Sequence, residues 1–201
     1  LGKLKEAETS YLKAIKFRPL FANAFYNLAN TLRDLNKLKE AENFYLKAIE
    51  SKPDLANAYS NLGAVLRDLG NPKKAEKFIR NAIKINPNIA ETYNNLACVL
   101  IDFGDLENAE KSLLKAINLN PDLVKSYYIL SRLSKSDNKQ KWHDYIFNKS
   151  ILNNKSPKDK IDIYFSRANI LHKKKSYKES SQNLVLANKI KLEIIPSDSS
   201  A

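Results

Sequence analysis

Polar side chains that could bind another molecule recur along this chain at intervals of 34 residues. They are Asn27, Asn61 and Asn95, each followed by an aspartate in the same helical stretch, at Asp34, Asp68 and Asp102. A carboxamide both donates and accepts hydrogen bonds, and a carboxylate only accepts them. A row of such groups suits the backbone of an extended peptide, which offers both N–H and C=O groups.

Residues that usually carry catalysis or bind metals are scarce. His143 and His172 stand 29 positions apart, with no cysteine or carboxylate at the spacing of zinc ligands. Cys98 is the one thiol, and without a histidine in the pattern it indicates a small filler rather than a nucleophile. Four glycines hardly suffice for a phosphate-binding loop. We therefore predict no catalytic residue, no metal site, no cofactor and no enzymatic activity for this chain.

The elements that must position the polar row follow from a gapless internal repeat. Prolines divide the chain at Pro19, Pro53, Pro87 and Pro121, each 34 residues after the last. Between them an aromatic residue, leucines and two alanines return at fixed places. In one repeat these are Tyr59, Leu62, Leu66, Ala75 and Ala82. A period of this length indicates a repeat architecture.

Each repeat reads as a helical hairpin. Its two halves carry apolar residues at i, i+3, i+4 and i+7, first at Phe25, Leu28, Ala29 and Leu32 and then at Ala41, Phe44, Tyr45 and Ala48. Between the halves, Gly70 and Gly104 are expected to end the first helix, and Asn71 or Asp105 to cap the second. Such a hairpin has more apolar surface than it can bury alone, so it must stack on its neighbours.

This pattern of aromatic, leucine, glycine or alanine, alanine and proline resembles the tetratricopeptide repeat (TPR) family. The resemblance implies an all-α solenoid of stacked antiparallel helix hairpins, about five and a half in number, in a right-handed superhelical arc. The expected solenoid spans 1–194 and is divided into the second helix of a truncated repeat (1–21), full repeats (22–55, 56–89, 90–123), a degenerate repeat (124–157) and a terminal repeat-like hairpin (161–194). Residues 195–201 are expected to form a tail or linker.

The polar row lies on one face of the first helix of each repeat, opposite the apolar stripe. The predicted groove residues on this face are Asn23, Asn27, Asn30, Asp34, Asn57, Asn61, Asp68, Asn95 and Asp102. The TPR resemblance implies that a protein or peptide binds on this concave face. Asn27, Asn61 and Asn95 form an expected asparagine ladder, which is similar to that of the TPR region of O-linked N-acetylglucosamine transferases. The alternative is that these asparagines are only polar helix residues in a chain rich in asparagine.

The charge on this face predicts the kind of partner. TPR domains that clamp the C-terminal carboxylates of heat-shock chaperones carry Lys or Arg where this chain has Asp34, Asp68 and Asp102. Carboxylates facing a ligand carboxylate would repel it. We therefore expect a neutral or basic peptide rather than an acidic one.

The net charge of +12 is concentrated towards the C-terminus, where residues 132–201 carry +8. Lysines cluster at 135–141, 155–160 and 173–175, which suits either a polyanion site or a solvated surface. Arginine, the usual choice for reading phosphates and bases, occurs only 6 times against 28 lysines, so we expect no nucleic-acid binding and favour a surface that docks another domain. No apolar run reaches the length of a membrane span, so no membrane association is expected, and the lone cysteine with no export signal predicts a cytoplasmic protein.

A second resemblance concerns the C-terminal part. The stretch Ile161–Lys173, followed by Tyr177–Ser181 and Leu186–Asn188, is similar to the end of the TPR region in bacterial TPR–sulfotransferase proteins. It implies a substrate-recruiting region with a catalytic domain downstream. A structural or dimerising spacer is a further alternative. The absence of methionine and the start within a repeat predict a fragment of a longer protein.

Overall fold

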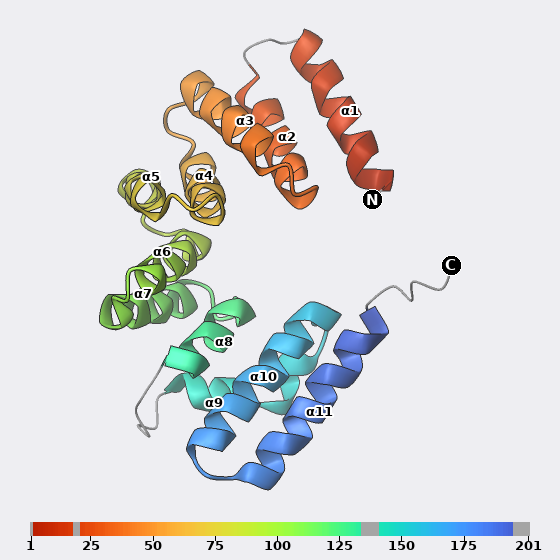
Figure 1. Ribbon diagram of the computed structural model, residues 1–201, viewed down its shortest axis with the longest axis vertical. Coiled ribbons are helices and arrows are strands. Elements are labelled where there is room, and N and C mark those ends of the chain that lie inside the picture. The colour runs from red at the N-terminus through yellow and green to blue at the C-terminus, as the bar shows by residue number, and fades with distance from the viewer. Residues whose placement is uncertain (1, 18–20, 134–140, 195–201) are drawn as a thin grey trace. The chain divides into compact units, whose positions relative to one another are not determined.

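The computed structural model describes residues 2–17, 21–133 and 141–194. Within these ranges all regular structure is helical, with eleven α-helices, one short 3-10 helix and no strand (Figure 1). The predicted all-α class of stacked helix hairpins is confirmed. The chain divides into two compact units, Leu1–Leu119 and Asn120–Ala201.

The first unit is a row of helical hairpins that follows the 34-residue period (Figure 1). Its helices are α1 (Gly2–Phe17), α2 (Ala22–Asp34), α3 (Leu38–Ser51), α4 (Ala56–Asp68), α5 (Pro72–Ile85), α6 (Ala90–Asp102) and α7 (Leu106–Leu119). Each first helix packs on the second helix of its hairpin, and α3 and α5 also pack on the first helix that follows. In addition α2 contacts α4, and α4 contacts α6, so the first helices form a continuous row.

The repeated alanines lie where the helices cross. Ala41, Ala75 and Ala109 are fully buried, as are Ala48, Ala82 and Ala116. The leucines of the first helices, such as Leu28 and Leu62, fill the space beside them. A methyl side chain lets two helix backbones approach closely, and the leucines then close-pack around the crossing. The repeated residues therefore specify how the helices contact one another as well as which side of each helix is apolar.

The turns inside the hairpins depend on a left-handed residue. Gly70 and Gly104 have φ values of 79° and 77°, and Asn36 takes the same conformation with φ 60°. Glycine and asparagine adopt this region most readily. Asp105 caps α7, since its Oδ1 accepts the N–H of Asn108 at 3.2 Å. The predicted cap by Asn71 is wrong, because its Nδ2 donates instead to the carbonyl of Leu69 at 3.3 Å.

The second unit contains α8 (Val124–Leu133), α9 (Lys141–Phe147), the 3-10 helix η1 (Lys149–Leu152), α10 (Pro157–Lys173) and α11 (Tyr177–Ile194). α10 packs on α8 and on α11, and α9 contacts α10. Where the full repeats carry a second helix of 14 residues, this unit has the 7-residue α9 and then η1.

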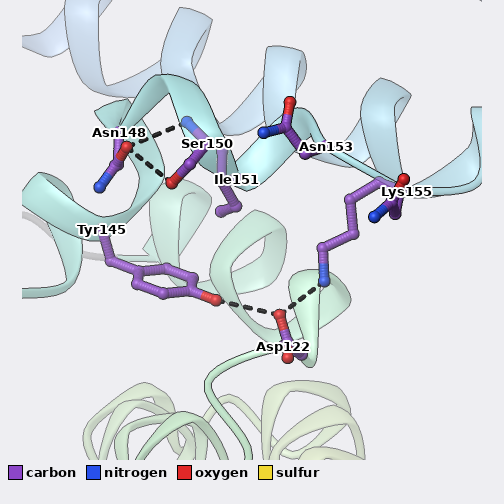
Figure 2. Close-up of a pocket in the computed structure, with 8 residues that line it drawn as sticks. Asp122, Tyr145, Asn148, Ser150, Ile151, Asn153 and Lys155 are labelled. Carbon is purple, nitrogen blue, oxygen red and sulfur yellow. Dashed lines mark hydrogen bonds and ion pairs between the residues drawn. The ribbon is translucent and has the colours of Figure 1, made fainter.

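An ion pair occupies the place of the repeat's proline. Lys155 stands where the full repeats have proline, and its Nζ lies 2.6 Å from Asp122 Oδ1. The hydroxyl of Tyr145 donates to the same oxygen at 3.1 Å (Figure 2). These two hydrogen bonds, that of Lys155 first, lower the pKa of the Asp122 carboxyl. Side chains thus restrain the end of the degenerate repeat.

His143 is buried in the second unit. It is 8% exposed, its ring meets Trp142 edge to face with 4.1 Å between centroids, and its Nδ1 has no hydrogen-bond partner among the residues that the structure describes. Burial lowers the pKa of the imidazole, and the nearby ammonium groups of Lys174 and Lys173 lower it further against the opposing carboxylate of Asp144. A charged His143 is therefore disfavoured in the folded unit.

Gly63→Ala should destabilise the first unit. An alanine inside a helix normally gains about 1 kcal/mol over glycine. Here, however, a Cβ would overlap Ile79 Cγ1 and lie 3.0 Å from the carbonyl oxygen of Ala75. We expect a net loss of about 1–3 kcal/mol in urea unfolding followed by circular dichroism. The matched change Ala97→Gly, in register on α6, should cost about 1 kcal/mol through the helix backbone alone. A Gly63→Ala variant as stable as the parent would contradict the close crossing.

Acidification should weaken the second unit through His143. The pKa of His143 is lowered on folding, so as the pH falls below about 6.5 the unfolded chain binds the proton first and the free energy of unfolding decreases. Trp142 is the only tryptophan and lies beside His143, so its fluorescence reports the unfolding of this unit. The pH dependence should shrink in His143→Phe and persist in His172→Phe, which alters an exposed histidine. Equal pH profiles for these two variants would refute the assignment.

Candidate functional site

The predicted groove residues all lie on the row of first helices α2, α4 and α6. Asn23, Asn57, Asp34, Asp68 and Asp102 are exposed, and Asn27, Asn30, Asn61 and Asn95 are half-buried. The structure joins Asn30 and Asn61 by a hydrogen bond. Among the described residues, Asn27, Asn61 and Asn95 form no hydrogen bond with one another.

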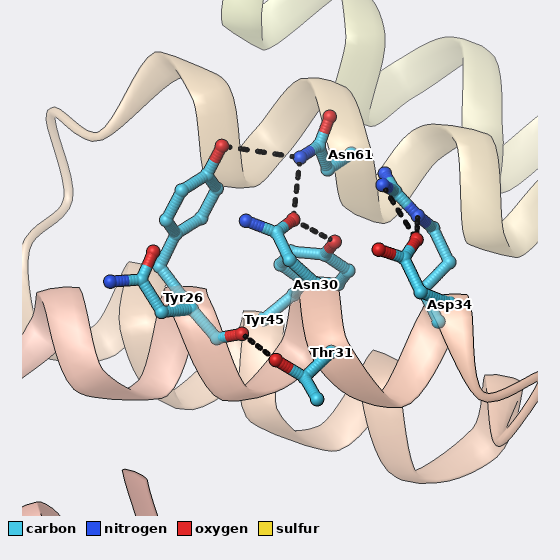
Figure 3. Close-up of polar contacts among 8 residues, drawn as sticks. Tyr26, Asn30, Thr31, Asp34, Tyr45 and Asn61 are labelled. Carbon is cyan, nitrogen blue, oxygen red and sulfur yellow. Dashed lines mark hydrogen bonds and ion pairs between the residues drawn. The ribbon is translucent and has the colours of Figure 1, made fainter. Parts of the chain in front are cut away.

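A polar network connects α2 with α4. Asn61 Nδ2 donates to Asn30 Oδ1 at 2.9 Å and lies 3.3 Å from the hydroxyl of Tyr26 (Figure 3). The hydroxyl of Tyr45, from α3, donates to the same Asn30 oxygen at 2.6 Å. Tyr45 is fully buried, and this burial raises its pKa to about 12, so the hydroxyl keeps its proton at neutral pH. Three helices therefore meet at one carboxamide oxygen.

The next pair of first helices is joined in a related way. Asn95 Nδ2, on α6, lies 3.1 Å from the hydroxyl and 3.4 Å from the carbonyl oxygen of Ser60 on α4. Ser60 and Tyr26 are 34 residues apart and so occupy the same place in their repeats. Each of these two ladder asparagines thus uses its amide group to bind the preceding first helix. The sequence predicted the row of asparagines but not these partners.

The internal bonds leave a defined set of polar groups on the face. Within the described residues, the Oδ1 atoms of Asn61 and Asn95 accept no hydrogen bond, and the carboxamide of Asn27 makes none. Asn30 retains its Nδ2 group, because only its oxygen is engaged. Acceptor oxygens therefore remain at all three positions, Asn27, Asn61 and Asn95.

The aspartates of the face are partly paired with arginines. Arg33 Nη2 lies 3.2 Å from Asp34, and Arg67 lies 2.9 Å from Asp68 and 3.6 Å from Asp102. The aspartate side chains are 44–52% exposed, so these pairs are screened by water and contribute little to stability. The signal was present in the sequence as two Arg-Asp pairs 34 residues apart. The face is therefore less acidic than the aspartates alone predict.

Lysines from two of the clusters seen in the sequence form contacts within the second unit. Lys155 pairs with Asp122, and Lys173 Nζ binds the carbonyl oxygens of Ser131 and Arg132 at 2.7 and 3.2 Å, at the end of α8. The lysine cluster at 135–140 lies outside the described residues. A shallow cavity of about 320 Å³ surrounds the Asp122–Lys155 pair (Figure 2). Its two charged groups neutralise each other, so this cavity has no charge to recruit a ligand.

Within the described ranges, no group of three or more His, Cys, Asp or Glu side chains is arranged to hold a metal ion. No helix in these ranges is both long and apolar enough to cross a bilayer.

A row of helical hairpins with polar first helices defines a repeat scaffold of the α-solenoid class. The sequence profile of the tetratricopeptide repeat matches residues 20–87 and 54–122, about half of the chain. The protein belongs to the tetratricopeptide repeat family, as the residue pattern predicted.

Solved structures with the same fold cover 56–98% of this chain. MamA 41-end from Desulfovibrio magneticus RS-1 superimposes with a TM-score of 0.58 and 16% identity, over 98% of this chain and 89% of that chain. YrrB, described as a TPR protein with an unusual peptide-binding site, superimposes with a TM-score of 0.56 and 21% identity, over 92% of this chain and 93% of that chain. The first TPR domain of Spaghetti (RPAP3), bound to the HSP90 peptide SRMEEVD, superimposes with a TM-score of 0.53 and 20% identity, over 56% of this chain and 89% of that chain.

At identities of 16–21%, these structural similarities show the fold alone. No curated protein matches the sequence at a significant level. The resemblance to sulfotransferase-associated TPR regions therefore stays a prediction.

The three ladder asparagines should differ in their effect on stability. Asn61→Ala and Asn95→Ala each remove hydrogen bonds between first helices, so each should lower the free energy of unfolding by about 1–2 kcal/mol. Asn27→Ala removes no such bond and should change it by less than about 0.5 kcal/mol. Urea unfolding followed by circular dichroism measures all three. Equal losses at the three positions would contradict the bonding pattern described above.

Proposed function

We propose that this protein is a binding scaffold that holds an extended protein segment along the row of α2, α4 and α6. The observation that carries the proposal is the state of the ladder carboxamides. Asn61 and Asn95 are held in place by bonds from their amide groups to the preceding helix, while their oxygens remain available. A fixed acceptor loses little conformational entropy when it binds a backbone N–H, which favours a ligand with a regular spacing of N–H groups.

The chemistry of the face favours a neutral or basic ligand. The available oxygens of the ladder can accept hydrogen bonds, and ammonium and guanidinium groups are donors without acceptors. Glu91 and the exposed aspartates add negative charge beyond what Arg33 and Arg67 offset. Asp102 is the least paired of the three aspartates, since its nearest cation lies at 3.6 Å. A basic side chain of the ligand would bind best near α6.

Peptide binding by proteins of this fold supports the proposal. YrrB has a peptide-binding site, and the RPAP3 domain binds SRMEEVD, a peptide with three acidic side chains. This chain carries Asp34, Asp68 and Asp102 on its first helices, so SRMEEVD serves as a ligand that it should reject.

Selection from a library of random 12-residue peptides tests the proposal. Selected peptides should be neutral or basic, and their affinity in calorimetry should fall at least about fivefold in Asn27→Ala, which removes about 1 kcal/mol of hydrogen bonding. Asn43→Ala, an exposed asparagine on α3, is the matched control and should bind as the parent does. Asp102→Asn should weaken basic peptides more than neutral ones and reduce the salt dependence of binding.

Two outcomes would refute this function. One is the selection of acidic peptides, or binding of SRMEEVD as tight as that of the selected peptides. The other is that the affinity for the selected peptides is unchanged both in Asn27→Ala and in Asp102→Asn.

A further inference from the structure

The last helix, α11, has a second apolar stripe that nothing in the described structure covers. The helix buries Ser180 and Ala187. The stripe consists of Tyr177, Leu184, Val185 and Leu192, which are 59%, 40%, 64% and 72% exposed. Their spacing of i, i+7, i+8 and i+15 places them on one side of the helix, next to the side that holds the buried pair.

The stripe includes a position that is buried in the complete repeats. Leu184 stands three residues before Ala187, as Tyr45 and Ile79 stand three residues before Ala48 and Ala82. Tyr45 and Ile79 are fully buried. Ile79 lies against Gly63, and Tyr45 bonds Asn30, each within its own hairpin, and α3 and α5 also pack on the first helix that follows. α11 packs on α10, and Leu184 remains exposed.

α11 is also longer than the second helices of the full repeats. It has 18 residues, whereas α3, α5 and α7 have 14 each. The added turn places Leu192 in the stripe, at the position where a full repeat has the proline that follows its second helix. The stripe is therefore longer than the surface that one stacked hairpin uses.

Lysines border this stripe. By helical spacing Lys178 and Lys189 lie along one edge, with Glu193 one turn after Lys189, and Lys191 lies along the other edge, while Glu179 lies on the opposite side of the helix. The surrounding segment, residues 132–201, carries a net charge of +8. A second copy of this chain would bring the same positive surface and be repelled. An apolar helix with acidic flanks would complement both the stripe and its borders.

We propose that the stripe of α11 docks an amphipathic helix of a partner protein whose apolar face is flanked by Asp and Glu. The partner helix takes the place that the first helix of a further repeat would take, as α4 and α6 do on α3 and α5. Apolar side chains meet the stripe, and the acidic flanks meet the three lysines. This second docking surface is separate from the row of first helices and does not depend on the function proposed for it.

A helix from the protein's own repeat serves as the probe. The α6 sequence, residues 90–102, contains Glu91 and Asp102 and no basic residue. It is a natural partner of α5, so a helix-stapled peptide of this sequence with Cys98→Ala presents an apolar face and acidic side chains together. In NMR titration its chemical-shift changes should centre on α11. The stapled α4 sequence, residues 56–68, pairs Arg67 with Asp68, carries no net charge and should bind more weakly.

Variants on α11 locate the site. Leu184→Ser with Leu192→Ser should raise the Kd of the α6 peptide at least about tenfold. Leu186→Ser is the matched control, because Leu186 is 43% exposed on the same helix but lies off the stripe. It should leave the Kd unchanged. Raised salt should weaken binding of the α6 peptide.

Three results would overturn the proposal. The first is the absence of shift changes at α11 with millimolar α6 peptide. The second is equal binding of the acidic and the neutral peptide at every salt concentration. The third is a dimer in light scattering that Leu192→Ser dissociates, because a second copy would then be the occupant.

Discussion

Close crossing of paired helices at small residues is the contact on which the first unit depends. Ala41, Ala75 and Ala109 are fully buried at these crossings. At Gly63 the approach is tighter still, since a methyl group would overlap Ile79. Because the backbones lie so close, the side chains of one hairpin reach the next. The stacking of hairpins, and with it the row of first helices, follows from this approach.

The polar face and the packing of the repeats share residues. Asn61 and Asn95 join successive first helices through their amide groups, and the same side chains present their oxygens on the face. The position of each oxygen is therefore fixed by the stacking of the hairpins. A polar face built in this way needs no separate support, because the scaffold orients its own polar groups. Under the proposed function it would also couple affinity for a ligand to the stability of the repeat.

Much of the architecture could be predicted from local patterns in the sequence. The apolar spacing, the alanines and the two glycines specify helices, crossings and turns within one repeat, and the structure has all of them. The pairing of Asn61 with Asn30 and Tyr26 could not be predicted. It depends on the rotation and shift between neighbouring hairpins, which periodicity alone does not specify. The departure of the short α9 from the repeat could also be predicted, since the alanines and the proline that define a second helix are absent there.

The replacement of proline by Lys155 changes how that part of the chain responds to its surroundings. A pyrrolidine ring restricts the backbone covalently, and no solute or proton can remove the restriction. The contact from Lys155 to the largely exposed Asp122 is electrostatic, so dissolved ions compete with it. The proline turns of the full repeats therefore do not depend on salt, whereas the ion pair at the end of the degenerate repeat weakens as the salt concentration rises.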